Sequence, residues 1–180
     1  MSVISVERDF ASLSLTLIAQ FDAPIERVWQ LWADPRMLER WWGPPTHPAI
    51  VEKHDLVAGG EVTYVMTGPD GEVSRGRWSV TSVESPTSLE FMDGFANADG
   101  TLNAELPRFA ARVRLHQHDG GTRMELRFKL ESTEHWKQLE RWGAFDMFPQ
   151  AVGQMDAVLN INPQLQEERP WARPSTRSPT

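Results

Sequence analysis

The final stretch of the chain, from Asp146 to Ile161, has apolar residues at intervals of three and four, which is the spacing of one face of an α-helix. These residues are Phe148, Ala151, Val152, Met155, Val158 and Leu159. Asp146 is predicted to cap the helix, with Pro149 in its first turn, where the missing N–H removes a donor that has no intrahelical partner. A helix of about sixteen residues is roughly 24 Å long, so its apolar face requires a broad partner surface.

Most of the preceding chain alternates apolar and polar residues, as half-buried strands do. Strands are predicted at 10–21, 50–57, 61–67, 72–83, 89–93, 109–116 and 122–130. Glycine-containing turns such as Pro69-Asp70-Gly71 and Asp119-Gly120-Gly121 separate neighbouring strands and favour antiparallel pairing. We therefore expect an α+β fold in which a curved antiparallel sheet of six to seven strands wraps around the final helix.

Three shorter helices are expected beside the sheet. Pro24 fits the first turn of one that follows the first strand, and Asp34 caps a second with Pro35 at its first position. A third helix, over residues 134–142, is capped by Ser132 or Thr133 and ends at Gly143. The two short helices after the first strand are thus predicted to lead into the strands of the sheet.

The composition excludes several classes of protein. The 180 residues carry a net charge of −7 and no cysteine. The acidic balance argues against a nucleic-acid partner, because it cannot compensate phosphate charge. No apolar run reaches about 18 residues, so no membrane span is expected, and the N-terminal residues do not form a signal peptide. Without cysteine there is neither a disulfide scaffold nor a thiolate nucleophile, and a cytoplasmic location is expected.

The length is that of one domain. Residues 1–9 are predicted to be an N-terminal extension and residues 10–163 the folded domain. Residues 164–180 are rich in proline and almost lack apolar residues, which is typical of a disordered tail.

Six short segments occur in an order and spacing that resemble a known family. They are FDAPIERVW (21–29), WWGP (41–44), GG (59–60), GPDGE (68–72), GGT (120–122) and QMD (154–156). Over residues 10–162 the chain resembles the activator of heat-shock protein 90 ATPase homologue family, within the START and polyketide-cyclase-like superfamily. The resemblance implies the helix-grip fold, in which the long C-terminal helix closes a cavity against the concave face of the sheet. It implies no single function, because members include small-molecule binders, cyclases, lyases, resistance proteins that sequester a ligand and relatives of a chaperone regulator.

No catalytic motif is visible, such as a nucleophile elbow or a phosphate-binding glycine loop. Acid and base chemistry would need dispersed polar residues, and the candidates are Tyr64, Asp93, Arg112, Arg114, His116 and Asp146. The two arginines and His116 share one face of a strand, opposite Val113 and Leu115, which favours a solvated outer face for them. His116 and His118 are spaced to share that face, but no third ligand accompanies them, so neither a metal site nor a cofactor is predicted.

The aromatic residues indicate an apolar pocket, and the leading hypothesis is a protein that binds a hydrophobic or aromatic small molecule. The residues predicted to line the cavity are Trp41, Trp42, Tyr64, Met66, Phe91, Phe95, Phe148, Val152 and Met155. A cyclase- or lyase-type enzyme that uses the same cavity is the second hypothesis, and it requires an inward-facing ionisable group such as Asp93, His116 or Arg112. A module that interacts with the chaperone heat-shock protein 90, with a role in the stress response, is the third hypothesis and requires an exposed patch.

Overall fold

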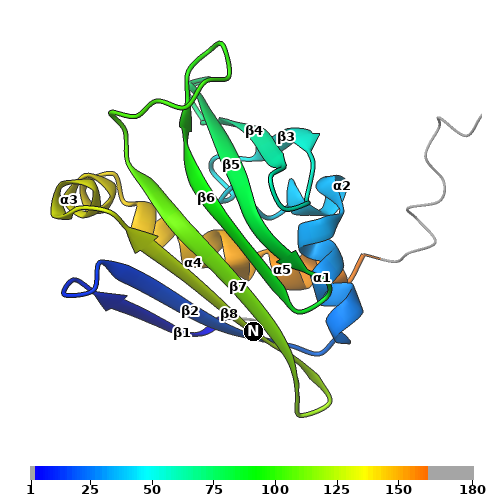
Figure 1. Ribbon diagram of the computed structural model, residues 1–180. Coiled ribbons are helices and arrows are strands. Elements are labelled where there is room, and N and C mark those ends of the chain that lie inside the picture. The colour runs from blue at the N-terminus through cyan, green and yellow to red at the C-terminus, as the bar shows by residue number, and fades with distance from the viewer. Residues whose placement is uncertain (1–2, 162–180) are drawn as a thin grey trace, which may run out of the picture.

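The strands form one curved antiparallel sheet in the computed structural model, which describes residues 3–161 (Figure 1). In this part of the chain the strands are β1 (Val3–Asp9), β2 (Ser14–Phe21), β3 (Ala49–His54), β4 (Glu61–Thr67), β5 (Val73–Glu84), β6 (Ser88–Ala96), β7 (Arg108–His118) and β8 (Gly121–Leu130). Their order across the sheet is β1-β2-β8-β7-β6-β5-β4-β3. The α+β class and the antiparallel sheet are therefore as predicted.

The described residues contain eight strands, so the predicted count of six to seven is wrong. The additional strand is β1, which lies within residues 1–9, the stretch expected to be an extension. It pairs with β2 from Val3 opposite Ala19 to Asp9 opposite Ser14. Almost all of its side chains are exposed, so it lacks the alternation that marks a half-buried strand. Backbone hydrogen bonds to β2, which leave no trace in the sequence, hold it in the sheet.

The helices of the described chain are α1 (Ile25–Ala33), α2 (Pro35–Leu38), α3 (Thr133–Arg141), α4 (Ala144–Gly153) and α5 (Met155–Leu159). Two predicted caps are confirmed. The Asp34 carboxylate accepts hydrogen bonds from the backbone N–H groups of Arg36 and Met37, and the Ser132 hydroxyl accepts one from the N–H of His135. Each cap satisfies backbone donors that have no partner within the helix.

The predicted continuous helix from Asp146 to Ile161 is instead two helices, α4 and α5, which meet at Gln154. Gly153, a poor helix former, precedes the break. At the other end α4 starts at Ala144, directly after Gly143, whose φ of 74° is left-handed. Asp146 therefore lies inside the first turn rather than at the cap. Because the helix begins earlier than expected, Pro149 falls in its interior.

The concave face of the sheet is covered by α4, α5 and α1, which cross it in Figure 1. Near α1 the space between helices and sheet is filled by large aromatic side chains that are fully buried, including Trp32, Trp41, Trp78 and Phe91. The rings of Trp78 and Phe91 stack with their centroids 3.8 Å apart. Dense packing is thus concentrated at the α1 end, and the other end of the concave face borders α3 and α4.

Two sequence expectations remain, one about membrane-spanning helices and one about the C-terminal residues. None of the helices in residues 3–161 is long and apolar enough to cross a membrane. The predicted disordered tail, 164–180, lies outside the described residues, as do the last two residues of the predicted domain, 162 and 163. The cavity described below is lined by residues within the described range, 3–161.

Candidate functional site

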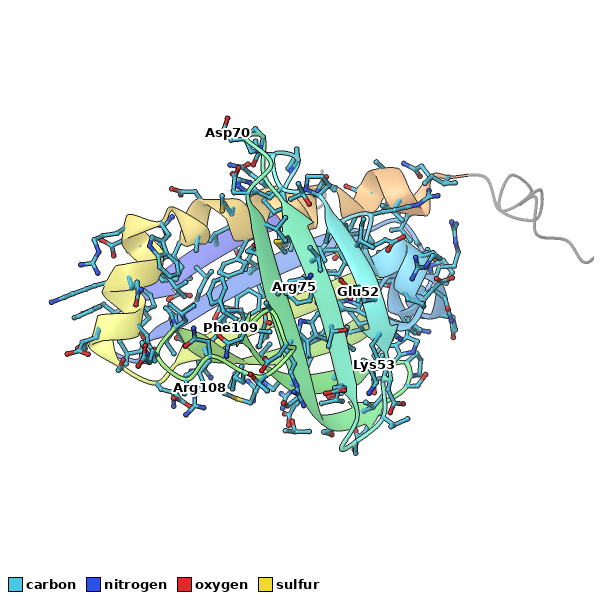
Figure 2. The ribbon with its side chains drawn as sticks, turned by 90° about the horizontal axis from the view of Figure 1, so that it is seen from above. Glu52, Lys53, Asp70, Arg75, Arg108 and Phe109 are labelled. Carbon is cyan, nitrogen blue, oxygen red and sulfur yellow. The ribbon has the colours of Figure 1, made fainter. Side chains whose placement is uncertain are left out.

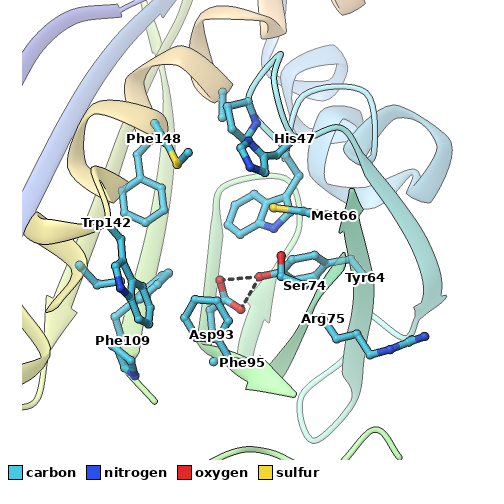
Figure 3. A pocket seen from close by; sticks show the side chains of 17 residues that line it. His47, Tyr64, Met66, Ser74, Arg75, Asp93, Phe95, Phe109, Trp142 and Phe148 are labelled. Atoms are coloured by element: carbon cyan, nitrogen blue, oxygen red, sulfur yellow. Dashed lines mark hydrogen bonds between the residues drawn. The ribbon is translucent and has the colours of Figure 1, made fainter. Parts of the chain in front are cut away.

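A cavity of about 260 Å³ lies between the concave face of the sheet and α4, at the end where α3 joins (Figure 3). Most of its lining residues are apolar or aromatic. The full lining is Trp42, Pro44, His47, Tyr64, Met66, Ser74, Arg75, Asp93, Gly94, Phe95, Pro107, Phe109, Leu139, Trp142, Met147, Phe148 and Ala151. Its volume is just below the range of about 300–1,000 Å³ that is usual for small-molecule sites. The space therefore suits a small organic molecule.

Five of the nine residues predicted to line a cavity lie in this lining: Trp42, Tyr64, Met66, Phe95 and Phe148. They come from the segment after α2, from β4, from β6 and from α4. Alternation along β4 indicates the inward face correctly, because Tyr64 and Met66 are in phase with the fully buried Val62. Residues distant in sequence thus meet around one space.

The other four residues, Trp41, Phe91, Val152 and Met155, are buried in the core and do not line the cavity. Trp41 packs edge-on against Trp32, and its indole Nε1 donates a hydrogen bond of 2.8 Å to the backbone carbonyl of Leu31. Phe91 is stacked on Trp78. All four point inward as expected. They differ from the lining residues because they lie where neighbouring side chains already fill the space.

Several lining residues were not in the predicted set, among them Phe109, Leu139, Trp142, Met147 and Ala151. Two of them carried a sequence signal. Phe109 is in phase with the apolar residues of β7, and Ala151 belongs to the apolar stripe of the final helix. Trp142 carried none, since it follows α3 and directly precedes the left-handed Gly143. It is 46% exposed, and its ring meets that of Phe95 edge-on with the two centroids 5.6 Å apart. These two observations place Trp142 at the mouth of the cavity.

One carboxyl group lies in this largely apolar lining. Asp93 is in phase with Leu89 and Phe91 on the inward face of β6 and is only 4% exposed. In the sheet register it stands between Trp78 on β5 and Phe109 on β7. The Tyr64 hydroxyl donates to both carboxylate oxygens, at 2.9 and 3.0 Å. An acidic residue among inward-facing apolar ones was the sequence signal for this group.

Tyr64 reaches Asp93 because of a glycine. Tyr64 on β4 pairs with Gly76 on β5, and Asp93 lies on the next strand, β6. A Cβ atom at position 76 would stand 2.0 Å from Cζ of Tyr64, far inside van der Waals contact. Since glycine has no Cβ, the phenol ring occupies that space and extends across β5. The Tyr64–Asp93 pair thus depends on the register of three adjacent strands, β4, β5 and β6.

Burial controls the protonation of this pair. It raises the pKa of Asp93 from 3.8 to about 8, even though hydrogen bonds from Tyr64 and the backbone N–H of Gly94 act in the opposite direction. Burial also raises the pKa of Tyr64 well above 10, with a further increase from the nearby Asp93 charge. Tyr64 therefore remains a donor. Asp93 titrates close to neutral pH, where it can exchange a proton or bind a polar group of a ligand.

The other candidate ionisable residues lie away from the cavity. Arg112, Arg114 and His116 alternate with buried apolar residues of β7, so the predicted outer face is confirmed. Asp146 is exposed and forms an ion pair with Arg8 at 2.6 Å. The described residues contain no group of three or more His, Cys, Asp or Glu side chains arranged to hold a metal ion. Of the six predicted candidates, only Asp93 and Tyr64 therefore lie in the cavity, whose lining also includes His47.

Comparisons with known proteins agree with this architecture. The model of the family described as "Activator of Hsp90 ATPase homolog 1-like protein" matches residues 22–160. Protein Ms6760 of Mycobacterium smegmatis is 45% identical, with a TM-score of 0.81, over 89% of this chain and 98% of its own. A protein from Arthrobacter aurescens is also 45% identical, with a TM-score of 0.84, over 88% and 92% of the two chains.

A more distant similarity shows a shared fold and nothing more. The AHSA1 protein of Silicibacter pomeroyi is 21% identical over 87% of this chain and 99% of its own, with a TM-score of 0.64. No curated protein matches the chain.

Proposed function

Because the chain belongs to the family of Activator of Hsp90 ATPase homolog 1-like proteins, and its sheet and α4 enclose a cavity, we propose that it binds a hydrophobic or aromatic small molecule there. The observation that carries the proposal is the cavity itself, which lies beside the aromatic core and has the half-exposed Trp142 at its mouth. Small-molecule sites are concave and mostly apolar, with a few polar groups that orient the ligand. A space of this size lined by apolar side chains therefore supports ligand binding.

Burial of apolar ligand surface would drive the binding. A ligand that buries about 200 Å² of apolar surface gains about 5 kcal/mol, before the costs of association are subtracted. The ring faces that line the cavity favour planar or aromatic ligands. The Tyr64–Asp93 pair at one side would orient a polar group of the ligand.

The proposal is tested by native mass spectrometry of the protein purified from its own host. We expect a stoichiometric small-molecule adduct that denaturation releases. Met147→Trp, which places a larger side chain in the cavity from α4, should remove the adduct. Gln150→Trp introduces the same residue on the exposed side of α4 and should keep it. The absence of any adduct, or its persistence in Met147→Trp with unchanged affinity, would count against the cavity as the site.

A cyclase- or lyase-type enzyme is a second candidate, and the position of Asp93 favours it. A carboxyl group with a pKa of about 8 inside an apolar cavity matches the needs of a general acid or base near neutral pH. Tyr64, which donates to both oxygens, would hold that carboxyl in place. If the released compound is converted by the wild-type protein, Asp93→Asn should abolish conversion and leave binding in place. A fully active Asp93→Asn variant would exclude this candidate.

A chaperone-interacting module is a third candidate, and a cytoplasmic location remains our proposal for all three. The first strand supports it, because Ile4 and Val6 on β1 are exposed apolar residues at one edge of the sheet formed by residues 3–161. Such side chains suit contact with another protein. A direct test is co-purification with heat-shock protein 90 from the same host, comparing wild type with the double variant Ile4→Ser, Val6→Ser. Equal recovery in both, or none, would reject this edge as the contact.

A further inference from the structure

The hydrogen bonds around Asp93 suit a carboxylate rather than a carboxylic acid. The Tyr64 hydroxyl and the Gly94 backbone N–H both donate to it. Within residues 3–161, no hydrogen bond links Asp93 to a group that acts only as an acceptor and could take a proton from it. The site therefore offers an anion two donors, and burial alone opposes its charge.

A positive partner for that anion is missing from the described part of the chain. None of its ion pairs includes Asp93. Two basic residues line the cavity, Arg75 from β5 and His47 from the segment before β3. Arg75 points away from Asp93 in Figure 3. Its guanidinium meets Glu52 at 3.3 Å, and the two are labelled side by side in Figure 2.

The remaining elements also leave Asp93 without a cation. Both ring nitrogens of His47 have partners elsewhere, with Nδ1 at 2.7 Å from the Thr46 hydroxyl and Nε2 at 3.5 Å from Glu72. The residues that α3, α4 and β7 contribute to the lining carry no ionisable side chain. Arg108, beside Gly94 in the sheet register, pairs with Glu131 at 2.9 Å. The described residues thus supply no counter-charge for the carboxylate of Asp93, which leaves that role open to a ligand.

We propose that the ligand of this cavity is an amine with an aromatic or apolar body, whose ammonium group pairs with the carboxylate of Asp93. This inference rests on the proposed binding function and names the chemical class of the ligand. Six aromatic side chains in the lining complement it: Trp42, Tyr64, Phe95, Phe109, Trp142 and Phe148. Ring faces attract cations as well as apolar groups, so the same lining serves the body and the charge of such a ligand.

The sign of the pH dependence follows from the ionisable groups. An alkylamine stays protonated up to about pH 10, as lysine does, whereas Asp93 in the empty cavity has a pKa of about 8. Below that pH an ammonium must displace the proton of Asp93, so affinity rises with pH towards 8 and then levels off. Tyr64 remains protonated throughout. A neutral ligand displaces no proton and shows no such rise.

The test compares 2-phenylethylamine with 2-phenylethanol, which share one aromatic body and differ in the charged group. Both are titrated into the full chain by calorimetry. From about pH 6 to about pH 8 the ionised fraction of a group with a pKa near 8 increases about 50-fold, and amine affinity should increase by a similar factor. Binding of the amine should release a proton near pH 6, which buffers of different ionisation enthalpy detect. Affinity for the alcohol should stay constant.

Variants separate this inference from the proposed function. Asp93→Asn should remove the preference for the amine and its pH dependence, and should still bind the alcohol. Glu26→Gln, which removes an exposed carboxylate on α1, should behave as wild type. Equal affinity for both probes, or a preference for the alcohol at every pH, would overturn the amine and leave small-molecule binding established. Failure of both probes to bind would overturn the amine as well, and the host adduct would then decide the binding function independently.

Discussion

Gly76 stands directly opposite Tyr64 in the β4–β5 pairing, and its missing side chain leaves the space through which the phenol reaches Asp93. The hydrogen bonds from Tyr64 to Asp93 therefore depend on the absence of a side chain at position 76. A substitution at this position tests the packing of the site directly.

We expect Gly76→Ala to destabilise the fold by about 1–3 kcal/mol, because the added methyl group displaces the Tyr64 ring and breaks its hydrogen bonds to a buried carboxyl. Urea denaturation measures the change. In a strand interior, replacing glycine by alanine otherwise stabilises the protein. A loss of stability in Gly76→Ala would therefore point to the displaced Tyr64 ring. Gly153→Ala, at the end of α4 where a Cβ meets nothing within 4 Å, is the control and should be neutral or slightly stabilising. A Gly76→Ala protein as stable as wild type would contradict the packing.

Stability should fall as the pH rises from about 4 to about 8. The pKa of Asp93 is about 8 in the folded protein and near 3.8 when unfolded, so in this window the folded state binds the additional proton. The contribution of Asp93 to the free energy of unfolding then decreases by at most about 1.4 kcal/mol per pH unit and levels off above pH 8. Urea denaturation across this range measures it.

Asp93→Asn should flatten this pH dependence and be more stable than wild type at the alkaline end. The exposed Asp9 and Asp99 and the half-buried Glu61 have pKa values lowered by hydrogen bonds from neighbouring residues. They act in the opposite direction and only in the acid range, below the window of Asp93. An unchanged slope in Asp93→Asn would show that other groups determine it.

Gln154 should be important although it lies at a break between two helices. Its side-chain amide donates to the backbone carbonyls of Trp41 and Gly43, at 3.3 and 2.7 Å. These bonds hold the segment that brings Trp42 into the cavity. We expect Gln154→Ala to cost about 1–2 kcal/mol of stability and to weaken binding of 2-phenylethanol. Gln150→Ala, an exposed glutamine of α4, is the control, and equal effects of the two changes would refute the role of these bonds.

Trp142 should control the rate of ligand exchange more than stability. It is half-exposed and touches Phe95 at the mouth of the cavity. Trp142→Ala should therefore change the free energy of unfolding by less than about 1 kcal/mol and increase the dissociation rate of 2-phenylethanol in stopped-flow measurements. Phe10→Ala removes a similarly exposed ring that contacts Trp136 instead. If both variants release ligand at the wild-type rate, the mouth lies elsewhere.

Local patterns determined much of the architecture. Alternation indicated which face of β4 and β7 turns inward, and short-range hydrogen bonding made Asp34 and Ser132 caps, as the structure bears out. These inferences succeed because side-chain direction follows directly from the period of a strand or helix. Asp93 was one of six polar candidates, but residue type alone did not separate it from those that lie away from the cavity.

Only the tertiary structure decided where the core is filled and where it is open. Trp41 and Phe91 point inward like Trp42 and Phe95, and all four contact other aromatic rings, yet of these four only Trp42 and Phe95 line the cavity. The meeting of Tyr64 and Asp93 likewise depends on the register of β4, β5 and β6 at Gly76. The sequence determined the faces because they follow from neighbours along the chain. The cavity and its polar pair depend on which residues far apart in the chain come together, which no local period records.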